Sequence, residues 1–204
     1  MMDEKNYSIS IDGLNQNPQK FIDTWSSLYN YSLEKKYNTH IDSVLKNKIS
    51  FIELFKWKNG TGDVISKSKM KVVEGFYTKI DILISLKKEF SWELFEDSFQ
   101  PSKNSSIWKI FLLHLVKPNS FPIYDQHVFR FYSFYSKGEI EEISSNHNVV
   151  YSTYKSDYRR WFNDYSKEHR LNPKLMDESF FTFGQMLKKI KDYPILIKPL
   201  STQS

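Results

Sequence analysis

The sequence predicts an all-α protein, and three patterns favour this class. Apolar residues recur at intervals of three and four over most of the chain, capping residues and helix-breaking pairs separate these segments, and strict alternation over the length of a strand is scarce. The 204 residues include 16 Phe, 13 Tyr and 5 Trp, which exclude disorder as the main state. No repeat, low-complexity tract or linker divides the chain, so we expect one domain over residues 1–204, with possible lobes at 1–100 and 101–204.

Five helices are expected in the first half of the chain. Asn17 and Pro18 mark the start of the first, because asparagine caps a helix N-terminus and proline suits the first helical turn. Asn59 and Gly60 mark the end of the second, because glycine readily adopts the left-handed conformation that closes a helix. The expected ranges are 18–36, 41–57, 68–88, 91–99 and 105–116.

Three helices are expected in the second half, after a break at residues 117–124. Pro118 and Pro122 disfavour continued helix there. Asp125 follows the break and is the expected N-cap of a helix that reaches about Ser136. Taken alone, this aspartate reads as a cap and nothing more. The two remaining helices are expected at 151–169 and 175–191.

The composition excludes several kinds of site. The chain contains no cysteine, which excludes a disulfide framework, a thiolate zinc site, an iron–sulfur cluster and a cysteine nucleophile. No His, Asp or Glu cluster has metal-ligand spacing, and no glycine-rich phosphate loop is present. We therefore expect neither a metal nor a cofactor.

Charge and hydropathy bear on partners and location. Lys and Arg number 29 against 24 Asp and Glu, a net charge of +5 that is compatible with a nucleic-acid partner. No apolar run approaches the length of a membrane span, and the N-terminal residues do not resemble a secretory signal. The sequence therefore predicts a cytoplasmic protein with no membrane partner.

The segment 107–134 contains the most informative motif, Phe-Pro-Ile-Tyr-Asp-Gln-His-Val-Phe-Arg at residues 121–130. It resembles the helix-hairpin-helix DNA glycosylase superfamily, which contains endonuclease III and the adenine and 8-oxoguanine glycosylases. The opening F-P-I-x-D is similar to the adenine glycosylase branch, and D-x-H-V-F-R is similar to the endonuclease III branch. The resemblance implies a two-lobed, all-α helix-hairpin-helix glycosylase-like fold, with Asp125 as the catalytic carboxylate and DNA carrying an extrahelical base as the partner.

The chain departs from the family pattern just before this motif. The family hairpin reads L-P-G-[VI]-G-x-[KST]-T-A, whereas residues 99–107 here contain no glycine, so the hairpin is degenerate. Either Ser102, Asn104 and Ser105 rebuild it around a helix N-terminus, or the DNA contacts have moved. The position of the family's Schiff-base lysine falls near Ile107, which implies a monofunctional enzyme. Lys103 and Lys109 lie close enough to leave lyase activity open.

Further candidates come from the motif, the basic stretches and the aromatic residues. Trp57 lies among lysines at a helix end, and Phe181 and Gln185 lie in a segment that resembles a late helix of the 8-oxoguanine glycosylases. Aromatic residues at helical spacing are more often core, and Arg130 is equally suited to brace the helix of Asp125. The expected DNA contacts are Lys103, Asn104, Ser105, Lys109, His127, Arg130, Arg159 and Arg160, and the expected base-pocket residues are Tyr124, Gln126, Trp57, Phe181 and Gln185.

The preferred hypothesis is a monomeric, monofunctional DNA glycosylase that removes a damaged or modified base. A fixed carboxylate stabilises the oxocarbenium-like sugar that forms as an N-glycosidic bond breaks, so one aspartate suffices. One version of the hypothesis has a hypermodified base of phage DNA as the substrate and antiviral defence as the role. The alternatives are a non-catalytic DNA- or protein-binding module that kept the fold, and a nuclease or lyase that uses Lys103 or Lys109.

Overall fold

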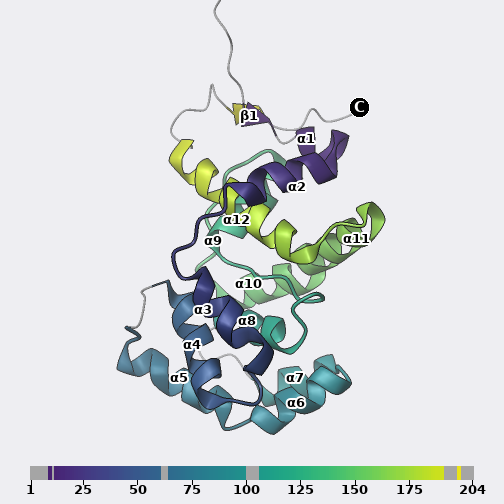
Figure 1. Cartoon of the computed structure of the whole chain (residues 1–204). Helices are drawn as coiled ribbons and strands as arrows, with labels where there is room; N and C mark the ends of the chain where they lie inside the picture. The colour runs from purple at the N-terminus through teal and green to yellow at the C-terminus, as the bar shows by residue number, and fades with distance from the viewer. Residues whose placement is uncertain (1–8, 11, 61–63, 100–105, 191–196, 199–204) are drawn as a thin grey trace, which may run out of the picture. The chain divides into compact units, whose positions relative to one another are not determined.

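The computed structural model describes residues 9–10, 12–60, 64–99, 106–190 and 197–198 (Figure 1). These residues belong to two compact units. We call Asn30–Phe121 the central unit, and Met1–Tyr29 together with Pro122–Ser204 the terminal unit. The described residues before Asn30 thus group with those after Phe121.

The regular elements of the described residues are helices except for one short strand pairing, which confirms the all-α class. Two-residue strands, β1 (Ile9–Ser10) and β2 (Ile197–Lys198), pair in parallel in the terminal unit. The central unit contains α3 (Glu34–His40), the 3₁₀ turn η1 (Ile41–Ser43), α4 (Lys48–Asn59), α5 (Lys67–Tyr77), α6 (Ile80–Lys88), α7 (Trp92–Ser98) and α8 (Ser106–Val116). The terminal unit contains α1 (Asp12–Gln16), α2 (Pro18–Ser27), α9 (Gln126–Lys137), α10 (His147–Thr153), the π-helical turn η2 (Tyr154–Tyr158), α11 (Arg159–His169) and α12 (Pro173–Ile190).

Two of the predicted helices end earlier than expected, and each end carries a local hydrogen bond from a side-chain hydroxyl to a backbone carbonyl oxygen. The predicted helix over 18–36 ends at Ser27, whose hydroxyl donates to the Thr24 carbonyl oxygen over 2.7 Å and so offers the backbone an alternative to continued helix. The predicted helix over 68–88 divides between α5 and α6, where the Thr78 hydroxyl donates to the Gly75 carbonyl oxygen over 2.8 Å. The expected C-cap at Gly60 is confirmed by its φ of 72°.

The core of the central unit contains a cluster of aromatic side chains. Phe55 packs against Phe51 and Phe111, with ring centroids 5.1 and 5.3 Å apart, and all three side chains are buried. Trp57 is also buried, and it stacks on Phe111 and packs against Tyr37. Each of these rings buries a large apolar area, and paired rings add to the packing of the core.

The terminal unit is organised around its longest helix, α12. This helix lies against both α2 and α9 (Figure 1). On the α9 side, Phe180 stacks on Phe131 with ring centroids 4.0 Å apart, and on the α2 side Phe183 packs against Phe21 at 5.4 Å. Both faces of α12 are therefore committed to the core, and α9 is held in place through its buried side.

Candidate functional site

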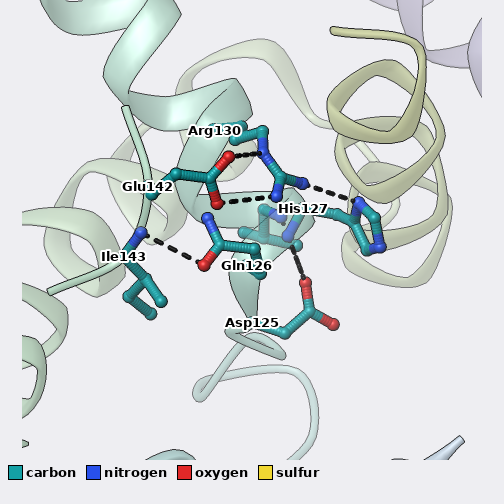
Figure 2. Close-up of polar contacts among 7 residues, drawn as sticks. Asp125, Gln126, His127, Arg130, Glu142 and Ile143 are labelled. Atoms are coloured by element: carbon teal, nitrogen blue, oxygen red, sulfur yellow. Dashed lines mark hydrogen bonds and ion pairs between the residues drawn. The ribbon is translucent and has the colours of Figure 1, made fainter. Parts of the chain in front are cut away.

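Asp125 lies at the start of α9 and caps it, as the sequence predicts. Its backbone is extended, with φ −152° and ψ −173°, and its Oδ1 accepts hydrogen bonds from the backbone N–H groups of His127 at 2.9 Å and Val128 at 3.2 Å. The side chain is only partly buried. Figure 2 shows the carboxylate at the first turn of α9, on the side away from Glu142. Two backbone donors therefore fix the orientation of a solvent-accessible carboxylate.

The turn that leads into Asp125 is anchored by two other elements of the terminal unit. The Ile123 N–H donates to Oδ2 of Asp177 on α12 over 3.3 Å, and the Tyr154 hydroxyl donates to the Pro122 carbonyl oxygen over 3.2 Å. Burial, with the nearby Asp177 charge, raises the pKa of Tyr154 well above its usual value, so this phenol keeps the proton that it donates. Neither anchor was expected from the sequence, because both contacts join residues that are distant along the chain.

Arg130 is buried and points into the protein rather than toward solvent. Its Nε donates to Oε1 of Glu142 at 3.1 Å and its Nη2 donates to Oε2 at 2.8 Å, a two-pronged pair (Figure 2). Its Nη1 donates to Nδ1 of His127 at 3.1 Å. The sequence left open whether Arg130 stabilises the helix of Asp125 or contacts a phosphate. The structure favours the first role, because Arg130 links α9 to the segment that follows it.

We expect Glu142→Gln to destabilise the protein by about 1–2 kcal/mol, because it leaves the buried guanidinium of Arg130 without its carboxylate. The Glu142 side chain is 55% exposed, and the effect is therefore smaller than for a fully buried pair. Chemical denaturation measures the change. Glu139→Gln, which removes an exposed carboxylate from the same segment, is the control and is expected to unfold like the wild type. Equal unfolding of both variants would contradict the bracing role of Arg130.

His127 lies between Arg130 and α12. Because a guanidinium only donates, Nδ1 of His127 is the acceptor in their hydrogen bond and carries no proton. Burial lowers the pKa of His127 and the Arg130 and Lys188 charges lower it further, while the Asp125 charge and a hydrogen bond with the Gly184 backbone act in the opposite direction. The imidazole is therefore neutral at physiological pH, which makes it a poor phosphate contact.

The lowered pKa of His127 predicts that acid destabilises the terminal unit. The unfolded chain takes up the proton at a higher pH than the folded chain, so stability is present at neutral pH and is lost as the pH falls below about 6.5 toward the folded value. We expect the melting temperature of the wild type to fall more between pH 7.5 and pH 5.5 than that of His127→Gln. The four other histidines are common to both proteins and cancel in the difference. Parallel curves would show that His127 has the same pKa in both states.

Two base-pocket candidates, Phe181 and Gln185, lie on α12 near His127. The Phe181 ring meets the His127 ring edge-on with centroids 4.9 Å apart, and it is only partly buried. Gln185 is exposed one turn further along α12. Gly184, beside it, packs directly against the His127 backbone. The structure therefore brings Phe181 against His127, two residues after Asp125, and leaves Gln185 exposed on the same helix.

The other base-pocket candidates are held in the interior. Tyr124 is buried against the rings of Tyr154 and Tyr158, and burial raises its pKa. Gln126 accepts a hydrogen bond at Oε1 from the Ile143 N–H over 3.1 Å (Figure 2). Trp57 lies in the core of the central unit, where it cannot stack on a base. The short motif does not reveal which side chains around Asp125 face the interior, so the burial of these candidates could not be predicted.

The expected DNA contacts lie in three different settings. Lys103, Asn104 and Ser105 fall outside the described residues. Lys109 is buried in the central unit, with its ammonium 5.6 Å from the centre of the Phe95 ring, and therefore does not present its charge to a phosphate. Arg159 and Arg160 lie on the helical stretch that begins with α10, and they line a groove.

The groove has a volume of about 390 Å³ and a strongly basic lining. It is formed by Ser152, Lys155, Ser156, Arg159 and Arg160. Sequence reasoning missed the two serines and the lysine. Their spacing carried the signal, since residues 152, 156 and 160, and residues 155 and 159, are four apart and share one helical face.

The terminal unit contains a second cavity, with a volume of about 340 Å³. It is lined by Tyr124 and Phe129, by the segment around Ile143 and by Val149 and Val150 of α10, with the Lys137–Glu141 ion pair at one side. Asp125 is not part of its lining. This cavity therefore does not place a substrate against the aspartate.

Comparison with known proteins leaves the family open. The chain matches no protein-family model, no curated protein and no solved structure. Among the described residues, no three His, Asp or Glu side chains are grouped so as to hold a metal ion. Within the same residues, no helix has both the length and the apolar character needed to cross a membrane.

Proposed function

We propose that the protein is a monofunctional DNA glycosylase that hydrolyses the N-glycosidic bond of a damaged or modified base flipped out of DNA. One observation carries the proposal: the partly exposed carboxylate of Asp125 is fixed at the N-terminus of α9 by two backbone N–H groups. The anchors at Pro122 and Ile123 hold the preceding turn as well. A preorganised negative charge is what the bond cleavage requires.

Asp125 would act on the sugar rather than on the base. As the bond between the anomeric carbon and the base nitrogen lengthens, positive charge develops on the sugar, and the carboxylate stabilises it. The same carboxylate orients a water molecule and accepts its proton as the water oxygen bonds to the anomeric carbon. The electron pair of the broken bond leaves with the base, which takes up a proton from solvent. Phe181, partly exposed and in edge-on contact with His127, offers a ring on which a flipped base can stack.

The surroundings of Lys109 support a monofunctional enzyme over a lyase. Ile107 stands near the position where the resemblance implies a Schiff-base lysine. The Lys109 side chain is buried, with its ammonium over the Phe95 ring, where an abasic sugar cannot reach it. Borohydride trapping is expected to yield no covalent adduct with DNA, and an adduct at Lys103 or Lys109 would instead favour the lyase.

The substrate can be identified by mass spectrometry of released bases. The protein is incubated with a panel of damaged-base duplexes and with phage DNA that carries hypermodified bases. Release of a base identifies the substrate, and release from phage DNA alone would favour antiviral defence, which protection of cells from the same phage would then test. Failure to release any base from the panel would favour the second candidate below.

The second candidate function is a non-catalytic nucleic-acid-binding module. The observation that favours it is the basic groove, which needs no reaction at Asp125 to bind an anionic partner. A binding module predicts salt-sensitive affinity for DNA without base release. The two candidate functions therefore predict different results for base release and the same result for salt-dependent DNA binding.

A further inference from the structure

The basic groove is built on an unusual piece of backbone. Between α10 and α11 the helix widens into the π turn η2, where the Arg159 N–H bonds to the carbonyl oxygen of Tyr154, five residues earlier. Single π turns inside α-helices are rare and occur frequently at functional sites. This one begins and ends at Tyr154 and Tyr158, and both of these side chains are fully buried.

The π turn separates an aromatic inner side from a basic outer side. Tyr154 and Tyr158 face the core, where the Tyr154 hydroxyl holds the turn before Asp125. The five residues that line the groove lie on the other side. Ser152, Ser156 and Arg160 are exposed, and Lys155 and Arg159 are partly buried.

We propose that this groove binds consecutive phosphates of a nucleic-acid backbone. The inference deepens the proposed function, from which it takes DNA as the partner. The lining supplies three cationic side chains and two hydroxyls and contains no carboxylate. Guanidinium groups donate in a planar fork that matches phosphate oxygens, and serine hydroxyls donate to the same oxygens.

The nearest acidic residue on this stretch acts on the opposite side. Asp157 lies within the π turn but does not line the groove. Its charge contributes to the raised pKa values of Tyr124 and Tyr132, which lie on the α9 side. Asp157 is therefore not one of the residues that would face a phosphate held in the groove.

The length and lining of the groove favour a polymer over a single ion or a lipid. Eight residues separate Ser152 from Arg160, about 12 Å at the rise of a regular helix. The groove is thus longer than a single phosphate group. Its lining contains no apolar side chain that could insert into a lipid bilayer.

The test is the salt dependence of DNA binding by the full chain. Fluorescence anisotropy with a labelled duplex is measured between 50 and 300 mM KCl for the wild type and for the double variant Lys155→Gln/Arg160→Gln. Because each lost phosphate contact lowers the slope of log K against log salt by about 0.9, the double variant should lose about 2 from the slope and about tenfold in affinity at low salt. Arg160→Lys, which keeps the charge, should retain the wild-type slope.

The matched control is Lys20→Gln/Lys189→Gln, which removes two exposed charges from α2 and α12 of the same unit. Its slope is expected to stay close to that of the wild type. Equal slopes for the control and the groove variant would overturn the proposal. The proposal would also be overturned if the groove variant bound duplex DNA like the wild type but no longer bound phosphatidylserine vesicles. The same holds if that variant bound the duplex like the wild type but inorganic phosphate no longer competed with binding.

Base release separates this proposal from the glycosylase proposal. If the wild type releases no base but the groove variant still loses its salt slope, the groove proposal stands and the proposed function fails. If the wild type releases a base and the groove variant binds DNA like the control, the groove proposal fails and the glycosylase stands.

Discussion

Replacing Gly184 with Ala is expected to destabilise the protein by about 3 kcal/mol or more, through overpacking between α12 and α9. A Cβ atom at Gly184 would lie 1.9 Å from the carbonyl oxygen of His127 and 2.6 Å from the carbonyl carbon. Both are backbone atoms at the first turn of α9, so no side-chain rotation relieves the contact. The two helices must move apart, and the stacking of Phe131 on Phe180 is lost with them.

Urea denaturation of Gly184→Ala measures this loss, and Gly75→Ala is its control. Gly75 also lies within a helix, but a Cβ atom there meets nothing within 4 Å. Alanine should therefore stabilise α5 by about 0.5–1 kcal/mol relative to glycine. The two substitutions are chemically identical and should have opposite signs. An unfolding midpoint for Gly184→Ala equal to that of the wild type would contradict the close approach of α12 to α9.

The sequence predicts the fold class and the helix ends that local chemistry determines. Asp125 at the start of α9 and Gly60 at the end of α4, with φ 72°, are examples, because a capping side chain and a left-handed glycine act within one turn. The π turn η2 could not be predicted. No local pattern in residues 154–158 distinguishes it from a regular helix, and the burial of Tyr154 and Tyr158 depends on partners far away along the chain.

The candidate site, like the fold, was predictable only where local chemistry determines it. The motif around Asp125 correctly placed a capped carboxylate, but the burial of its neighbours depends on contacts that a short motif does not reveal. Tyr124 and Gln126 point inward, and Arg130 pairs with Glu142 twelve residues later. Conversely, Lys155 was not among the predicted DNA contacts, although its spacing from Arg159 places it on the same helical face.

Asp125→Asn is expected to lower the rate of base release by about a hundredfold or more while leaving the fold intact. Asparagine keeps the Oδ1 acceptor for the two N–H groups of α9 but loses the negative charge. The protein already uses this cap elsewhere: Asn146 accepts from the N–H groups two and three residues ahead of it, over 3.0 and 3.4 Å, as Asp125 does. The substitution thus removes charge without removing the cap.

The measurements are base release, duplex affinity and the unfolding midpoint for each variant. Catalysis by the carboxylate predicts that Asp125→Asn changes only the first of these, since the cap and the basic groove are both retained. Asn146→Asp, the reverse exchange at the start of α10, is expected to leave base release unchanged. If Asp125→Asn released the base at the wild-type rate, the aspartate would be a helix cap alone and the glycosylase would need another catalytic group. If Asp125→Asn lowered the unfolding midpoint instead, the charge would serve the stability of α9 rather than a developing oxocarbenium ion.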